Sequence, residues 1–201
     1  MRNPIRRSRN IGKTQGERVK DGRAREKWDR VFTQDVWTRL SEGDEKWRIL
    51  TENPSRWYYH PCSGEEYMGV LARLPEDLTS EVKAIILRRK SKLDEKLEVQ
   101  ARKRYYCAIM NAFPISNEYV WRMRPEDSTF RHFERWCDDW REEDGFWKLC
   151  WQVDEARRYY LYHVFLHEVG HINQPAFHSL RRREEFAENF ALEWAQELGE
   201  L

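Results

Sequence analysis

Cysteine is scarce in this chain, and its placement excludes two classes of protein. The 201 residues include four cysteines, at positions 62, 107, 137 and 150, and no two of them have the CxxC spacing of a zinc or redox motif. Small secreted domains that depend on disulfides carry a much higher density of cysteine. We therefore expect reduced thiols, as in the cytoplasm, and no cysteine-based metal site.

Long apolar runs are also missing. No stretch approaches the ~20 apolar residues that span a bilayer, and the basic N-terminal region is not followed by the apolar segment of a secretory signal. We expect a cytoplasmic protein with no membrane partner.

Positive charge is concentrated at the N-terminus, although the net charge of the whole chain is only +1. Residues 1–30 carry 11 Lys or Arg against 4 Asp or Glu. Residues 1–24 have almost no large apolar groups, so burial cannot offset the entropy cost of ordering them. The sequence predicts a basic flexible arm over 1–24 and a single domain over 25–201. The arm could make weak, nonspecific contacts with nucleic acid that depend on salt.

The domain is predicted to be α+β with an aromatic core, since the chain contains 10 Trp, 9 Tyr and 9 Phe. Short β-branched and aromatic runs predict strands at 67–74, 83–89, 105–113 and 146–153. Apolar residues at helical spacing predict helices at 25–40, 127–143, 154–172 and 179–199. A single helical turn fits 78–82, and the charged stretch 90–104 fits either a helix or a hairpin arm.

The stretch HEVGH, residues 167–171, is the strongest chemical signal. On a helix, residues four apart project from the same side, so His167 and His171 can bind one ion. The apolar residues of the same helix lie on a different arc, which would face the core. Glu168 lies between the two arcs, where a base acting on metal-activated water belongs. Gly170 leaves room for a close neighbour.

A third metal ligand must come from another part of the chain, because a catalytic zinc ion typically has three protein ligands and an open position. The expected last helix offers Glu184 and Glu188, which share an arc with Ala191 and Ala195. Small side chains on that arc would let another helix approach closely. A carboxylate buried there needs a compensating cation. We therefore expect Zn²⁺ as the cofactor, with either glutamate as a candidate ligand.

These two motifs resemble a known arrangement. HEVGH followed by EEFAENFA is similar to the gluzincin pattern, HExxH and then ExxA(N/D)xFA, of the ImmA/IrrE group of metallopeptidases. The resemblance covers roughly residues 155–198. It implies a minimal zincin-like fold, in which a small twisted sheet packs against an active-site helix and a C-terminal helix. It also implies His167, His171 and Glu184 as zinc ligands, Glu168 as the general base, and hydrolysis of peptide bonds.

The resemblance further predicts that a peptide or protein substrate binds by β-augmentation at an edge strand, for which residues 105–113 are the candidate. The sequence departs from the pattern at Glu188, where Asn or Asp is usual. The 12 residues between His171 and Glu184 are also few for that group. Glu188 is therefore kept as an alternative ligand.

Several other interpretations compete with this one. Both histidines of the motif could be core residues bonded to backbone or carboxylate groups. His163, one turn earlier, suits packing or the orientation of a ligand, and His178 lies seven positions after His171, where the metzincin pattern needs six. The alternative functions are a non-catalytic zincin-like protein that regulates or associates with nucleic acid, and a structural metal site that braces the last two helices.

Overall fold

The computed structural model describes Thr38 and residues 46–201. The chain divides into two units, Met1–Asp44 and Glu45–Leu201, and the elements considered below belong to the second. The expected basic arm lies outside the described residues, as does the expected helix at 25–40 except for Thr38, which is helical. None of the described helices combines the length and the apolar character that a bilayer crossing requires.

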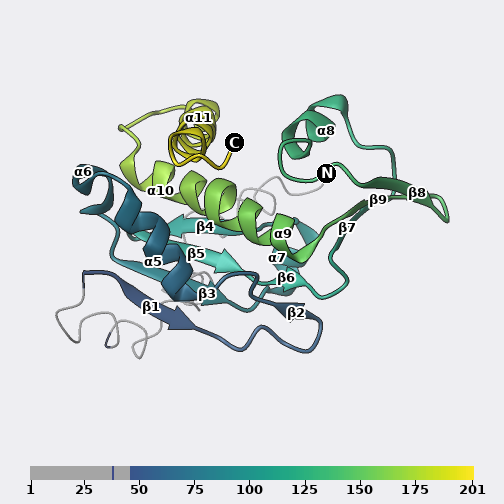
Figure 1. Ribbon diagram of the computed structural model, residues 1–201, viewed down its shortest axis with the longest axis horizontal. Helices are drawn as coiled ribbons and strands as arrows, with labels where there is room; N and C mark the ends of the chain where they lie inside the picture. The colour runs from purple at the N-terminus through teal and green to yellow at the C-terminus, as the bar shows by residue number, and fades with distance from the viewer. Residues whose placement is uncertain (1–37, 39–45) are drawn as a thin grey trace, which may run out of the picture. The chain divides into compact units, whose positions relative to one another are not determined.

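The fold is α+β, as expected, and is built on a four-stranded sheet with the strand order β1-β3-β5-β4 (Figure 1). The first three strands of that order are parallel, and the edge strand β4 runs antiparallel to β5. The strands are β1 (Arg48–Thr51), β3 (Ala84–Arg88), β5 (Cys107–Asn111) and β4 (Ala101–Arg104). Apart from Asn111, their buried residues are apolar, which suits a sheet that is covered by helices.

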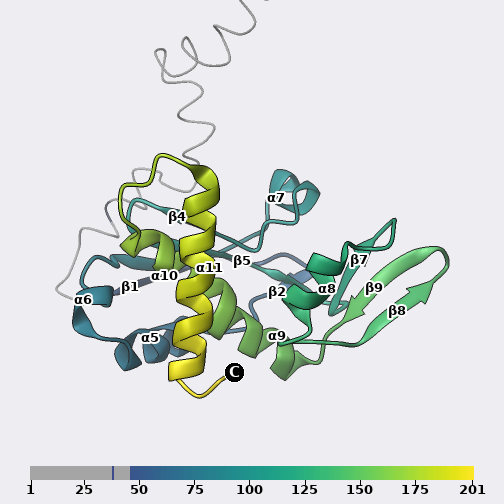
Figure 2. The ribbon, with the colours of Figure 1, turned by 90° about the horizontal axis from the view of Figure 1, so that it is seen from above.

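Two helical layers cover this sheet, as Figures 1 and 2 show from two directions. The first layer contacts the strands, and it consists of α5 (Gly64–Arg73) and one continuous segment made of α9 (Val153–Tyr159), the π-helical turn η2 (Tyr160–Val164) and α10 (Phe165–Asn173). The second layer is α11 (Leu180–Glu197), which crosses α10. Two short helices, α6 (Glu76–Thr79) and α7 (Lys92–Lys96), lie in the connections between strands.

A second, antiparallel sheet has the order β7-β9-β8 and accompanies helix α8. These elements are β7 (Glu118–Trp121), β8 (Trp140–Glu143), β9 (Phe146–Cys150) and α8 (Asp127–Phe133). A separate two-stranded sheet is formed by β2 (Tyr58–Tyr59) and β6 (Phe113–Pro114). Aromatic rings connect this region to α9. Trp151 has its ring centroid 5.8 Å from that of Phe133 and 5.0 Å from that of Tyr159. This contact places α8 beside the helix that leads to the HEVGH motif.

The expected strand at 67–74 is wrong, because those residues belong to helix α5. Ser63 starts this helix with a capping box: its Oγ accepts from the Glu66 N–H at 3.3 Å, and Glu66 Oε2 accepts from the Ser63 N–H at 2.7 Å. Tyr67, Val70 and Leu71 are buried at helical spacing. The apolar run alone suggests a strand here, but the capping box at Ser63 and Glu66 indicates a helix.

The expected helix at 127–143 is also only partly right, since α8 ends at Phe133 and residues from Trp140 form β8. The N–H groups of Trp136 and Cys137 both donate to the Phe133 carbonyl, at 2.7 and 2.9 Å, which closes a turn. The aromatic residues that suggested one helical face are divided between α8, the turn that follows it and β8. The long helix was expected to begin at Asp154 and begins at Val153. Its N-cap position is Gln152, which forms a capping box with Glu155.

Removing the Ser63 cap is expected to destabilise the fold. Ser63→Ala leaves the Glu66 N–H without its acceptor at the start of α5, so the free energy of unfolding should fall by about 1 kcal/mol. Urea titration followed by tryptophan fluorescence measures the change, and the exposed Ser116→Ala serves as a matched control. A loss no larger than that of the control would show that the capping box does not stabilise this helix.

Candidate metal centre

Helix α10 separates an apolar face from a histidine face, as its sequence predicts. Phe165, Leu166 and Val169 are fully buried toward the core. His167 and His171 lie on the other face, one turn apart, with ring centroids 4.7 Å from each other. The helix therefore presents two imidazoles side by side, supported from behind by the packed sheet.

Helix α11 approaches α10 closely at Gly170, as expected. A Cβ atom added to Gly170 would lie 3.0 Å from the Cα of Ala187 and 3.1 Å from the Cβ of Phe190. Ala187, Ala191 and Ala195 are completely buried along the same contact. The small residues on both helices thus bring the glutamates of α11 next to the histidines of α10.

The donor atoms of His167, His171 and Glu184 converge. Glu184 Oε2 lies 3.5 Å from His167 Nε2 and 3.5 Å from His171 Nε2. A tetrahedral ion with bonds of about 2.0–2.1 Å separates its ligand atoms by about 3.4 Å. The three side chains are therefore spaced so that they could hold one metal ion. This set matches the ligands that the family resemblance implies.

The outer nitrogens of both rings have partners that fix how the rings face the centre. His171 Nδ1 donates to Gln174 Oε1 at 3.1 Å, and His167 Nδ1 lies 3.4 Å from Glu188 Oε2. With the proton on Nδ1 of each ring, each Nε2 directs a lone pair toward the point that Glu184 faces. Burial acts against a charged ring, but the carboxylates of Glu188 and Glu168 raise the pKa of His167. The site is thus electrostatically favourable for positive charge.

The two candidate glutamates have different positions. Glu184 faces both Nε2 atoms, whereas Glu188 lies one turn further along α11, beside the outer nitrogen of His167. The Glu184 side chain is 54% exposed, so the expectation of a largely buried carboxylate is wrong for this residue. Glu184 is in the second turn of α11, near the end of the helix that is open to solvent. The convergence of three acceptor atoms, rather than burial of the carboxylate, is what calls for a cation.

Glu168 is a buried carboxylate at the wall of the same site. The residue follows His167 in sequence and is 6% exposed. Its Oε2 atom has no hydrogen-bond partner among the described residues. Burial raises the pKa of Glu168 to about 7, against the opposing effects of His167 and a hydrogen bond from the Lys103 backbone. Such a carboxyl group can accept and return a proton near neutral pH.

A cleft of about 560 Å³ runs past these residues and along the edge of the sheet. Its lining includes His167, Glu168 and His171 together with residues 98–103. The N–H of Asn111 on β5 donates to the Gln100 carbonyl at 2.8 Å. Because backbone groups alternate in direction along an antiparallel pair, those of Ala101 and Lys103 point away from β5. The Lys103 N–H already donates to Glu168, so an extended chain could pair with the backbone groups of Ala101 and with the Lys103 carbonyl.

The strand expected to bind substrate is therefore wrong. Residues 105–113 contain β5, which is hydrogen-bonded to β3 on one side and to β4 on the other, so it has no open edge. Among the described strands the sheet ends at β1 on one side and at β4 on the other, and β4, within the charged stretch that the sequence left undecided, is the edge that lines the cleft. That stretch contains both a helix, α7, and a hairpin strand, β4.

Other histidines and polar residues fall into place around the centre. His163 lies one turn before His167 and is almost fully buried, in agreement with a packing or orienting position. His178 is exposed and is not among the residues that line the cleft, so nothing supports a metzincin-like role for it. The sequence interpretation missed Gln174 and His132. Gln174 could have been found from its spacing, three residues after His171, but His132 is remote in sequence and had no such signal.

Comparison with models of protein families, with curated proteins and with solved structures finds no match for this chain. The resemblance to the ImmA/IrrE group therefore stays a prediction from the two motifs, and the functional argument depends on the geometry of the site.

Proposed function

We propose that the protein is a zinc-dependent metallopeptidase. The observation that carries the proposal is the convergence of His167 Nε2, His171 Nε2 and the Glu184 carboxylate at spacings of 3.5 Å, beside the buried Glu168. Two imidazoles and one carboxylate are a typical ligand set for catalytic zinc, and they leave a fourth position open. When bound, zinc would supply a Lewis acid that polarises the substrate carbonyl and activates water.

The remaining residues of the centre have roles that follow from their positions. Glu168 accepts the proton of the attacking water and then delivers it to the leaving amine. Gln174 and Glu188 hold the two imidazole rings through their Nδ1 atoms, so that the ligand atoms are oriented before the ion arrives. The close contact of α10 with α11 at Gly170 fixes the distance between the ligands on the two helices.

The neighbouring edge strand supports a peptide as the substrate. An extended peptide that pairs with the backbone groups of Ala101 and with the Lys103 carbonyl would lie along the cleft, with its bonds passing Glu168. The main-chain pairing would bind many sequences, since it does not read side chains. All four cysteines are free thiols, which fits the proposed cytoplasmic location.

Removal of the metal tests this function directly. The purified protein should contain at least about one zinc ion per chain. It should also cleave a mixture of fluorescence-quenched peptides. A strong chelator should reduce cleavage to background, and added Zn²⁺ should restore it, whereas Mg²⁺ should not, because it prefers oxygen ligands and octahedral geometry. Cleavage that persists after complete removal of metal would contradict the proposal. Zinc binding without cleavage of any peptide would favour the structural or regulatory alternatives.

A further inference from the structure

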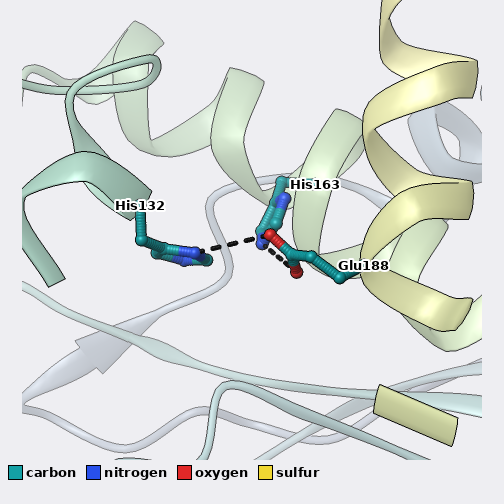
Figure 3. Close-up of side chains that lie close together, drawn as sticks. All are labelled: His132, His163 and Glu188. Atoms are coloured by element: carbon teal, nitrogen blue, oxygen red, sulfur yellow. Dashed lines mark ion pairs between the residues drawn. The ribbon is translucent and has the colours of Figure 1, made fainter. Parts of the chain in front are cut away.

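A second cluster of possible metal ligands lies in the same cleft, and it does not include any of the three ligands proposed above. His132 comes from α8, His163 from η2 and Glu188 from α11, and Figure 3 shows the three side chains directed toward one another. Glu188 Oε1 lies 3.6 Å from His132 Nδ1, and Glu188 Oε2 lies 3.5 Å from His163 Nε2. Each distance is close to the ~3.4 Å of a tetrahedral ion, but Glu188 offers a different oxygen to each ring, whereas Glu184 offers the same oxygen to both of its rings.

The hydrogen bonds of His132 place a lone pair next to the carboxylate. The Tyr159 hydroxyl donates its single proton to Gln100 Oε1 at 3.1 Å. Tyr159 must therefore accept from His132 Nε2, which lies 3.3 Å away and so carries the ring proton. In the neutral ring, Nδ1 then directs its lone pair at Glu188, and two acceptors face each other. A cation between them removes this conflict.

His163 offers its Nε2 atom to the cluster from an almost fully buried ring. Its side chain is only 5% exposed, and Nδ1 has no hydrogen-bond partner among the described residues. The rings of Tyr159 and Trp136 pack around it, with centroids 5.2 and 5.5 Å from that of His163. The aromatic rings close off Nδ1, so Nε2, which faces Glu188, is the nitrogen through which His163 would bind an ion.

We propose that His132, His163 and Glu188 form a second site for a divalent transition-metal ion such as Zn²⁺, next to the site of His167, His171 and Glu184. The ligand set of two imidazoles and one carboxylate suits zinc and related ions rather than calcium or magnesium. Tyr159 orients His132 in the second site as Gln174 orients His171 in the first.

The two sites are connected, although they share no ligand. Glu188 Oε2, which faces His163, also faces His167 Nδ1 at 3.4 Å. A carboxylate oxygen can bind a metal ion and accept a hydrogen bond together, so occupation of one site does not block the other. The proposal of a second site depends on these contacts and not on peptidase activity.

The number of bound ions tests the proposal. Metal-free protein is titrated with Zn²⁺ against a chromophoric chelator, and the bound equivalents are counted. We expect two equivalents for the unchanged chain, one for His132→Phe and one for His171→Asn. Phenylalanine keeps the ring packing of His132 but cannot bind metal, and His132→Asn repeats the test if that packing fails. The exposed His178→Asn is the matched control and should keep both equivalents.

Each other result is also decisive. A chain that binds one equivalent, retained in His132→Phe, would overturn the second site. Two equivalents that persist in His132→Phe would overturn it as well, as would the absence of any bound zinc. A single equivalent that is lost in His132→Phe but kept in His171→Asn would support the second site and contradict the zinc centre of the proposed peptidase.

Discussion

Glu168→Gln is expected to lower kcat/KM for peptide hydrolysis by about 10²–10⁴-fold while the zinc content stays unchanged. Glutamine has nearly the shape of glutamate, so the packing around this buried side chain is conserved. It cannot take a proton from water or return it to an amine, because its amide is not basic. The residue is not one of the converging ligands, and therefore the affinity for zinc should change little.

A matched variant on α11 separates this effect from a general loss of negative charge. Glu185 is an exposed glutamate next to Glu184 in sequence, and Glu185→Gln should leave both zinc content and hydrolysis within about two-fold of the unchanged protein, as surface substitutions usually do. Hydrolysis rates and zinc content are measured on the same preparations. Full activity in Glu168→Gln would rule out its role as the general base.

Gly170→Val is expected to cause the largest loss of stability, about 3 kcal/mol. A Cβ atom at this position already lies 3.0 Å from the backbone of Ala187, and valine adds two methyl groups that have no space between the helices. Helix α11 must move away, and Glu184 and Glu188 move with it. Affinity for zinc should therefore fall by more than ten-fold, since one ligand and one orienting carboxylate are displaced.

The same substitution at Gly69 provides the control. Gly69 lies in α5, where an added Cβ atom meets no other atom within 4 Å, so Gly69→Val should be neutral or slightly stabilising. Stability is measured by urea unfolding of the metal-free proteins, because bound zinc would itself stabilise the fold. Equal effects at the two positions would contradict the close contact between α10 and α11.

The local geometry around HEVGH could be predicted from the sequence because it depends on one helix. The period of 3.6 residues places His167 and His171 on one face, and Gly170 and the alanines indicate where a second helix approaches. The strands at 83–89 and 146–153 are confirmed as β3 and β9, since their apolar runs are short and bounded. The last helix is confirmed as α11, which begins at Leu180, next to its expected start at 179.

The parts that failed depend on contacts between distant segments. Periodicity does not tell which strand lies at the edge of a sheet, so β5 was mistaken for the open strand that is in fact β4. Rotation of a helix about its axis is likewise uncertain, and Glu184 is more exposed than its place on the α11 arc suggested. His132 reaches the cleft only because aromatic packing brings α8 beside α9, which no local pattern reveals.

The open edge of β4 has a consequence for the behaviour of the protein in concentrated solution. A strand with unpaired backbone groups can join the same strand of another copy as readily as it can join a peptide, and this would lead to self-association. The sequence of β4 is ARKR, and because Arg102 is paired with the buried Asp94, two such strands would bring the cations Lys103 and Arg104 of each copy together. Repulsion between them disfavours a homotypic pair, whereas an acidic or neutral segment of another protein meets no such barrier.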